Sequence, residues 1–271
     1  MGPLLTDDIV QRLTAARVQR EPSVAVSLDL GRTSVTVELG ETAWSVAGTA
    51  YPYPADTRER TIYHWDGAQF VPVARYNGAL IKLVPTPWGP PTFEIDGIKM
   101  LPTAHVSPYA DAQRKVGLVE PRGRRVLDTC GGLGYFAGCA LAAGAAAVLS
   151  YEKNADVLWL RTLNPWSPAR SEPLELVHGD VAAAIGALPS ASFDAILHDP
   201  PRFGIAGELY AQSFYDELAR VLRRRGRLFH YTGQPNRLTS GRDVPREVAR
   251  RLARAGFTTR ADGDGVLAVR G

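Results

Sequence analysis

Residues 124–233 alternate between short apolar runs typical of β-strands and stretches with the periodicity of amphipathic helices. The apolar runs are RRVLDTC, AVLSYE, LELVHGD, FDAILHD and GRLFHYTG, and the helical stretches lie at residues 132–144, 155–163, 181–187 and 208–224. Strands that alternate with helices in this way form a parallel sheet, because each helix returns the chain across one face of the sheet. This pattern predicts an α/β domain with helices on both faces of its sheet.

The C-terminal part extends this pattern with a helical stretch at residues 244–255 and the segment FTTRADGDGVLAVR. That segment predicts two short strands with a tight turn at Asp264 and Gly265. A tight hairpin adds one antiparallel strand, which we expect at the edge of the sheet. The predicted fold class is therefore α/β, with a doubly wound, mostly parallel seven-stranded sheet that ends in an antiparallel hairpin.

The first hundred residues have a different pattern, which is rich in strands. After a Thr/Asp cap, residues 6–20 have near-helical apolar spacing, and SVAVSLDLGRTSVTVEL and TIYHWDGAQFVPVARY each predict a β-hairpin. Residues 83–103 are rich in proline and glycine and predict a connector with one short strand, FEIDGIKM. We expect two domains: a small β-rich N-terminal domain over residues 1–103, which is a candidate substrate-recruiting module, and the α/β domain over residues 104–271.

The composition is that of a globular protein, with 45% hydrophobic and 22% charged residues in 271. No apolar run approaches the roughly 20 residues that span a membrane, and the N-terminal MGPLLTDDIVQRL has acids where a signal peptide needs bases. We therefore expect a cytoplasmic protein without a membrane partner. The two cysteines and five histidines show no zinc-ligand spacing, so no metal site is predicted. The oligomeric state is left open.

Positive charge is concentrated near the C-terminus, although the net charge of the chain is only +3. From Arg220 to Gly271 there are thirteen arginines and four acidic residues. One interpretation is a solvated helix face in an arginine-rich chain, and the other is a surface that faces phosphate groups.

The stretch VLDTCGGLGYFA, residues 126–137, combines a buried strand, a glycine-rich turn and the start of a helix. Such a turn lets the backbone approach a nucleotide closely, and the helix start supplies N–H groups and positive dipole. Acids at the ends of the next strands add specificity. Glu152 can accept from ribose hydroxyls and Asp180 from an adenine amine, whereas Asp199, followed by two prolines, has no obvious use in hydride transfer.

These acidic strand ends and the C-terminal hairpin resemble the class I S-adenosylmethionine-dependent methyltransferases over about residues 104–271. The motifs LDTCGGLGY, NPWS, HDPPRF, GELY and LFHYTG also resemble a mostly archaeal subgroup of predicted methyltransferases, in which the resemblance extends back to PTFEIDGIKM. The resemblance implies a Rossmann-like fold and S-adenosylmethionine as cofactor. It assigns Asp128, Gly132 and Gly134 to the methionine part, Glu152 to the ribose and Asp180 to adenine. Cys130 replaces the usual first glycine of the turn, and we include it among the cofactor-binding residues.

HDPPRF resembles the Asp/Asn-Pro-Pro-aromatic motif of methyltransferases that act on an amine conjugated to a ring. In such a motif a side-chain oxygen of Asp199 and the carbonyl oxygen of Pro200 each accept one N–H of the amine. Arg202 stands where the aromatic residue normally follows, and can itself stack or hold a phosphate, while the ring comes one residue later, at Phe203. The predicted catalytic residues are Asp199, Pro200, Arg202 and Phe203, and the alternative is a stiff loop after a strand.

Other aromatic and histidine side chains fall near the same strand ends. His198, His230 and Tyr231 either line the predicted pocket or are structural. Tyr210, Phe214 and Tyr215 surround a helix start and fit the core better than a base-stacking role.

The leading hypothesis is an RNA methyltransferase that modifies an exocyclic base amine. N4 of a cytidine in rRNA is the first choice and N2 of a guanosine in tRNA the second. A second hypothesis is a small-molecule transferase, such as a polyamine aminopropyltransferase, whose acidic pocket would include Asp199, Glu208, Asp216 and Glu217. A third is a Rossmann-like scaffold that binds RNA or protein without catalysis.

Overall fold

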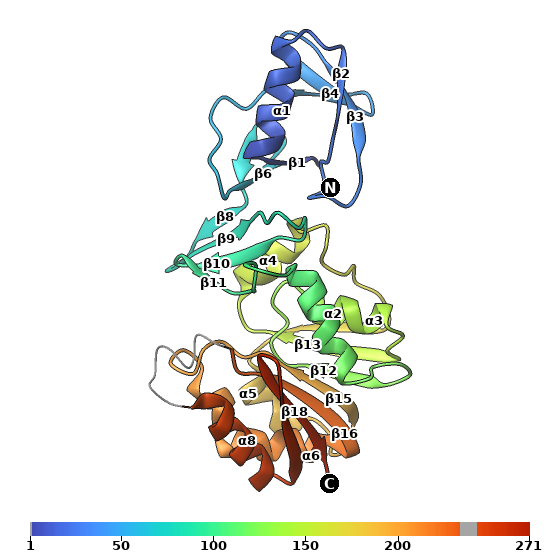
Figure 1. Ribbon diagram of the computed structural model, residues 1–271, viewed down its shortest axis with the longest axis vertical. Helices are drawn as coiled ribbons and strands as arrows, with labels where there is room; N and C mark the ends of the chain where they lie inside the picture. Colours follow the sequence, from blue (N-terminus) through green and yellow to red (C-terminus); the bar gives the residue numbers. More distant parts are fainter. Residues whose placement is uncertain (1, 234–242) are drawn as a thin grey trace. The chain divides into compact units, whose positions relative to one another are not determined.

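The computed structural model describes residues 2–233 and 243–271, which are drawn in colour in Figure 1. The chain divides into two compact units. The first contains Met1–Pro108 and Trp159–Ser167, and the second contains Tyr109–Leu158 and Pro168–Gly271. None of the described helices is long and apolar enough to cross a membrane.

A seven-stranded sheet forms the centre of the second unit, in the order β14-β13-β12-β15-β16-β18-β17. The pairs from β14 to β16 are parallel, whereas β18 is antiparallel to both β16 and β17. The strands are β12 (Arg125–Asp128), β13 (Ala147–Glu152), β14 (Leu174–His178), β15 (Phe193–His198), β16 (Leu222–Tyr231), β17 (Phe257–Asp262) and β18 (Gly265–Arg270). The mixed α/β architecture with a large central sheet agrees with the sequence-based prediction.

The C-terminal hairpin differs from the prediction in two respects. Its antiparallel strand, β18, lies between β16 and β17 and is not at the edge of the sheet. Its turn falls at Gly263 and Asp264, because Gly265 already pairs with Asp262 in the ladder. Gly263 has a φ of 56°, which favours glycine, and a Cβ on Gly265 would come within 2.5 Å of the His230 carbonyl oxygen. The close approach to β16 therefore requires glycine as the first residue of β18.

Helices cover the sheet, and two of them show how the sequence sets their bounds. Helix α3 begins at Tyr135, later than expected, because Gly132 and Gly134 have positive φ values of 48° and 82°. In α8 the Asp243 side chain caps the Arg246 N–H, and the apolar positions Val244, Val248 and Leu252 are buried on one face. The helices are α2 (Pro108–Leu118), which the sequence pattern did not predict, α3 (Tyr135–Ala142), α4 (Ala155–Leu163), α5 (Val181–Ala184), α6 (Gln212–Val221) and α8 (Val244–Arg254), with 3-10 turns η1 (Ile185–Ala187) and η2 (Gly207–Tyr210).

The predicted helix over residues 208–224 is interrupted at both ends. It begins as the separate 3-10 turn η2, and α6 ends at Val221 because Leu222 already pairs with Phe193 of β15. The pairing then resumes at Ala195 and Arg227. The residues between form a bulge in which Arg223, Arg224 and Arg225 are exposed, and Arg225 has a φ of 62°.

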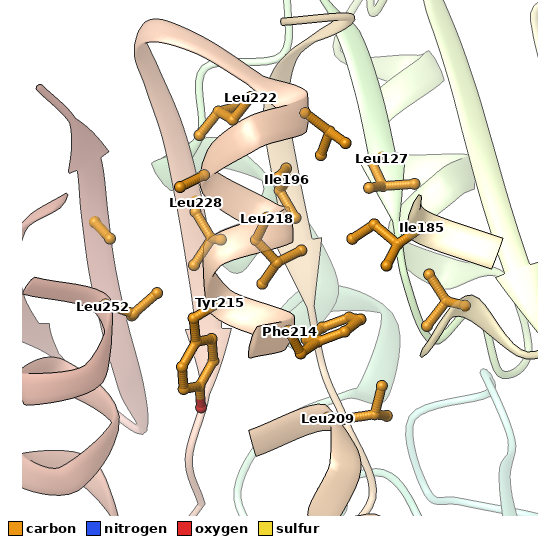
Figure 2. Close-up of a cluster of buried hydrophobic side chains, with 14 of the residues drawn as sticks. Leu127, Ile185, Ile196, Leu209, Phe214, Tyr215, Leu218, Leu222, Leu228 and Leu252 are labelled. Carbon is orange, nitrogen blue, oxygen red and sulfur yellow. The ribbon is translucent and has the colours of Figure 1, made fainter. Parts of the chain in front are cut away.

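The core of the second unit lies between the sheet and helices α5, α6 and α8 (Figure 2). Leu127, Ile196 and Leu228 come from three strands and meet Leu218 of α6 and Leu252 of α8. Each of these leucine and isoleucine side chains is fully buried, and burial of one such side chain stabilises the fold by about 1.5 to 3 kcal/mol. Helices α2 and α3 contact each other through Tyr109 and Tyr135 and lie on the other face (Figure 1).

The first unit contains one long helix and three small antiparallel sheets, in the orders β1-β6-β7, β2-β3-β4-β5 and β11-β10-β9-β8. Its core surrounds Trp44, together with Leu13 of the helix. The elements are α1 (Asp7–Val18), β1 (Leu4–Thr6), β2 (Ser23–Val26), β3 (Val35–Leu39), β4 (Ala43–Val46), β5 (Thr49–Pro52), β6 (Ile62–Trp65), β7 (Phe70–Pro72), β8 (Ala74–Tyr76), β9 (Leu80–Val84), β10 (Thr92–Ile95) and β11 (Ile98–Lys99).

The predicted N-terminal helix and both hairpins are present in this unit, as α1, the β2/β3 pair and the β6/β7 pair. FEIDGIKM is a hairpin of β10 and β11, and not the single strand that was predicted. Asp96 and Gly97 have φ values of 47° and 76°, as a tight two-residue turn requires.

Candidate active site

The glycine-rich turn follows β12 and leads directly into α3. The Gly131 N–H donates to the Tyr151 carbonyl oxygen of β13, and the Gly134 N–H donates to the Gly131 carbonyl oxygen, both at 2.7 Å. These bonds and the positive φ values of Gly132 and Gly134 fold the turn tightly over the carboxyl ends of β12 and β13. Helix α3 therefore begins at the carboxyl ends of the parallel strands, where open parallel sheets bind their ligands.

Glu152 ends β13 and holds the turn in place. Its Oε2 accepts from the Gly132 N–H and its Oε1 from the Asn154 N–H, each at 2.8 Å. A carboxylate offers about four acceptor directions, so two backbone bonds do not exhaust it. Glu152 thus connects the glycine turn to the start of α4, and its role in ribose binding stays a prediction.

Asp180 follows β14 and caps helix α5. Its Oδ1 accepts from the Ala182 N–H at 2.9 Å, and its Oδ2 pairs with Lys153 Nζ at 2.6 Å. The hydrogen bond from Lys153 holds the pKa of Asp180 below its ordinary value, so the group is ionised at neutral pH. Asp180 is half-buried and follows the end of β14, and its role in adenine binding stays a prediction.

Asp128 and Cys130 lie beneath the turn. The Asp128 carboxylate is fully buried, and its Oδ2 accepts from the Ser150 hydroxyl at 2.8 Å. Burial raises the pKa of the Cys130 thiol well above its ordinary value, and the charges of Glu152, Asp128 and Asp199 add to this effect. Cys130 is therefore a neutral thiol at pH 7, which excludes a thiolate nucleophile. The acids at the ends of β12, β13 and β15 all act on the Cys130 thiol.

Asp199 follows β15 directly and is partly buried. No described residue donates a hydrogen bond to its carboxylate. Burial raises the pKa of Asp199 to about 6, which the positive charge of Lys115 opposes and the charges of Asp111 and Asp264 reinforce. A carboxylate at this strand end without a hydrogen-bond donor among the described residues is suited to accept from a ligand.

The two prolines after Asp199 differ in their contacts. Pro200 is buried, and among the described residues no hydrogen bond reaches its carbonyl oxygen. The Pro201 carbonyl oxygen accepts from the Tyr210 hydroxyl at 3.0 Å, which fixes the loop against η2. The end of β15 therefore presents two neighbouring acceptors, the Asp199 carboxylate and the Pro200 carbonyl oxygen.

Arg202 and Phe203 have separate environments. Arg202 is exposed, and its carbonyl oxygen accepts from the Ile205 and Ala206 N–H groups. Phe203 is half-buried, packs against the core of the second unit and contacts the edge of Tyr210 with 5.4 Å between ring centroids. Phe203 therefore shares its surface between core packing and solvent.

His198 and His230 are fully buried and form a fixed pair. His198 Nε2 faces the Leu209 carbonyl oxygen, so it donates there and Nδ1 accepts from the Thr129 hydroxyl at 2.7 Å. His230 Nδ1 likewise donates to the Tyr231 carbonyl oxygen, and Nε2 accepts from the Tyr215 hydroxyl at 3.0 Å. Burial lowers the pKa of His198 well below its ordinary value and that of His230 to about 4. Both rings are neutral parts of the core, as are Tyr210, Phe214 and Tyr215.

A buried lysine near Asp199 is the feature that the sequence analysis missed. Lys115 of α2 is only 1% exposed, and its Nζ lies 2.6 Å from Asp111 Oδ2 and 3.2 Å from Asp264 Oδ2. The same ammonium group lies 4.1 Å from the centroid of the Tyr231 ring. The spacing of Asp111 and Lys115 by four residues signals a helical ion pair, but α2 itself was not predicted.

Three acids proposed for a polyamine pocket have other surroundings. Glu217 pairs with Arg220 at 2.6 Å, and Asp216 accepts from the Gln212 side chain on the surface of α6. Glu208 is exposed on η2. Within the described part of the chain, no group of three or more histidine, cysteine, aspartate or glutamate side chains is arranged to hold a metal ion.

Comparison with known proteins finds solved structures of similar fold and a relative by sequence. No family model matches the chain. Among solved structures, a spermidine synthase in complex with the transition state analogue AdoDATO superposes with a TM-score of 0.60 and 18% identity, over 76% of this chain and 77% of that one. MNMC2 from Aquifex aeolicus gives 0.53 and 17% identity over 70% of each chain. An S-adenosylmethionine-dependent methyltransferase from Mesorhizobium loti gives 0.43 and 16% identity, over 59% and 94%.

The first two of these structures share the fold of this chain, which confirms the Rossmann-like architecture. A relationship by sequence is much stronger. The uncharacterized protein MJ1233 of Methanocaldococcus jannaschii is 42% identical over 201 residues, which cover 73% of this chain and 69% of the relative. The chain therefore belongs to the protein family of MJ1233.

Proposed function

We propose that the chain is an S-adenosylmethionine-dependent methyltransferase that modifies an exocyclic base amine in RNA. The observation that carries this proposal is the pair of acceptors at the end of β15. The Asp199 carboxylate and the Pro200 carbonyl oxygen receive no hydrogen bond from described residues, and they are adjacent in sequence. An NH2 group has two N–H donors, so two neighbouring acceptors fit it better than a ring carbon or a single hydroxyl.

The residues around the glycine turn fit the proposed cofactor. Gly132 and Gly134 allow the close backbone approach, Glu152 lies beside the turn and Asp180 is ionised at the next strand end. Cys130 is a small neutral residue at the turn, and the fully buried Asp128 side chain lies at the end of β12. When bound, S-adenosylmethionine supplies an electrophilic methyl group.

The chain's own part of the reaction is orientation and proton transfer. The nitrogen lone pair of a conjugated amine is delocalised into the ring. If Asp199 and Pro200 each accept one N–H, the nitrogen is drawn toward a tetrahedral geometry with its lone pair directed away from the two acceptors. Asp199 is largely ionised above pH 6, so it can also take the proton that the nitrogen loses.

RNA is the proposed acceptor because of the arginine-rich C-terminal part. Arg246, Arg250 and Arg254 are exposed on α8 and form no ion pair with a described residue. Residues four apart on a helix are separated by about 6 Å along the axis, so the three guanidinium groups form a row. Such a row can contact successive phosphates. N4 of a cytidine in rRNA is the first proposed target and N2 of a guanosine in tRNA the second.

Calorimetric titration with S-adenosylmethionine and its demethylated product tests the proposal. The wild type should bind both, and Asp180→Ala should weaken both by about 1 to 3 kcal/mol, because an adenine amine would lose its acceptor. Asp216→Asn, an exposed change on α6, is the control that should leave the affinity unchanged. Tight binding of NAD with no binding of either sulfur ligand would contradict the proposal.

Aminopropyl transfer to a polyamine is the second candidate function. It is supported by the spermidine synthase fold match, which has a higher TM-score than the other two solved structures described above. Incubation with decarboxylated S-adenosylmethionine and putrescine tests it, with spermidine as the product. If the protein binds RNA but neither sulfur ligand, the third alternative, a non-catalytic scaffold, is favoured.

A further inference from the structure

Lys115 lies in a compact cluster of charges at the carboxyl edge of the sheet. Its ammonium group contacts Asp111 of α2 and Asp264 of the β17–β18 turn, and the Tyr231 ring of β16 lies 4.1 Å away. No ion pair between described residues joins Asp199, at the end of β15, to Lys115, but the charge of Asp199 raises the pKa of Lys115 more than those of Asp111 and Asp264 do. Helix α2, the β17–β18 turn and β16 thus each place a carboxylate or a ring against one nitrogen.

The lysine remains charged in this cluster. Burial by itself lowers the pKa of Lys115, but the charges of Asp199, Asp111 and Asp264 outweigh burial and raise it above its ordinary value. The only other described cation in ion-pair contact with the cluster is Arg114. It is 43% exposed, and reaches Asp264 at 2.7 Å, Asp111 at 3.5 Å and Asp262 at 3.6 Å. Removal of Lys115 would leave Asp199 without its opposing charge.

We propose that Lys115 is a specificity-determining residue, because its ammonium group occupies the place among Asp111, Asp264 and the Tyr231 ring that an alkylammonium acceptor would otherwise take. This inference rests on the proposed transferase function. A polyamine needs carboxylates that are available to its ammonium groups. Here the Lys115 ammonium group is already paired with Asp111 and Asp264 from inside the protein. The acceptor oxygens of Asp199 therefore face a neutral N–H donor, such as a base amine, and a polyamine is excluded.

An alternative role for Lys115 is to anchor α2 to the β17–β18 turn. Both roles predict that Lys115→Ala loses stability, because a buried ion pair that loses one partner leaves uncompensated charge. Both roles predict that ethylammonium fills the cavity that Lys115→Ala leaves beside Asp111 and Asp264. Only the specificity role predicts that the second ammonium group of putrescine reaches Asp199, so that Asp199→Asn, added to Lys115→Ala, weakens the binding of putrescine more than that of ethylammonium. Binding of the two amines to the single and double variants therefore separates the roles without any activity assay.

The experiment compares the wild type with Lys115→Ala, Lys115→Arg and Arg114→Ala by calorimetry and thermal unfolding. Lys115→Ala should bind putrescine at least about tenfold more tightly than the wild type, and ethylammonium should raise its Tm but not that of the wild type. Lys115→Arg keeps a cation in the cluster and should resemble the wild type. Arg114→Ala is the matched control, since it removes a neighbouring, exposed cation from the same carboxylates.

Two results would overturn the inference. One is a folded Lys115→Ala protein that binds putrescine no better than the wild type does. The other is a wild type that already binds putrescine as tightly as the variant. If Lys115→Ala does not fold, the double variant Asp111→Asn, Lys115→Ala has one charge fewer, and the same gain in affinity is required of it. The proposed function fails separately, if the wild type does not bind S-adenosylmethionine.

Discussion

Replacement of Asp199 by asparagine should stabilise the protein at neutral pH. In the folded chain the pKa of Asp199 is raised from 3.8 to about 6. A shift of about two units corresponds to about 3 kcal/mol of unfavourable free energy when the carboxylate is ionised. Asparagine has nearly the same shape and keeps one carbonyl oxygen, but has no charge to bury.

The sign of the pH dependence follows from the direction of this shift. Well below pH 3.8 the carboxyl is protonated in both the folded and the unfolded chain, and Asp199 does not lower the stability. As pH rises from 4 to 6, the unfolded chain releases the proton before the folded chain does, so the wild type loses stability. Above pH 6 the full penalty remains. The Asp199→Asn variant should therefore be more stable than the wild type by up to about 3 kcal/mol at pH 8, and by only about 0.6 kcal/mol at pH 4.

Urea unfolding at both pH values, followed by circular dichroism, measures the difference. Asp216→Asn on the exposed face of α6 is the matched control and should stay within about 0.5 kcal/mol of the wild type at both pH values. Equal stabilities of Asp199→Asn and wild type at pH 8, or a difference that is the same at pH 4 and pH 8, would refute the reasoning.

Three other predictions concern the surroundings of the site and the RNA surface. Tyr215→Phe should lower the free energy of unfolding by about 1 to 3 kcal/mol, because it leaves the buried His230 Nε2 without its donor; urea unfolding checks this, with Tyr76→Phe on the surface as control. In the native protein at pH 7 iodoacetamide should not alkylate Cys130, whereas in urea-unfolded protein it should, and mass spectrometry can detect the modified cysteine. Rapid alkylation of Cys130 in the native protein would contradict a neutral thiol. When glutamine replaces all three arginines of the α8 row, the affinity for a single-stranded RNA 20-mer should depend less on salt, with the slope of log affinity against log salt concentration shallower by up to about three. Anisotropy titrations at several salt concentrations measure this slope, with glutamine at Arg223, Arg224 and Arg225 as the control. An unchanged slope would exclude the α8 row as a phosphate contact.

The strand ends of the α/β unit were predictable from sequence because each combines two local signals. Asp128, Glu152, Asp180 and Asp199 all end an apolar run of strand length, and a glycine-rich turn, a helix start or a proline follows each of them within four residues. Such signals lie within ten residues and do not depend on tertiary contacts. The acids that end neighbouring parallel strands then lie together, because the carboxyl ends of parallel strands share one edge of the sheet.

The features that the sequence did not reveal depend on contacts between distant residues. Lys115 became part of the site through Asp264, about 150 residues away in the chain, and no local pattern pairs them. The C-terminal turn was placed one residue too late because Asp264-Gly265 satisfies the usual turn chemistry. In the structure Gly265 packs closely against β16 and belongs to the ladder, so the turn lies at Gly263 and Asp264. The position of β18 inside the sheet likewise results from tertiary pairing.

Methyl transfer by the wild type and the Asp199→Ala variant tests the central claim most directly. Both proteins are incubated with methyl-labelled S-adenosylmethionine and total RNA, and the RNA is digested and its nucleosides analysed by mass spectrometry. Cofactor affinity is measured in parallel. The wild type should form a nucleoside methylated on an exocyclic amine, whereas Asp199→Ala should bind the cofactor within about twofold of the wild type but transfer no label, because its carboxylate acts only on the acceptor. An Asp199→Ala protein that methylates RNA at the wild-type rate, or label that passes only to a polyamine, would contradict the account.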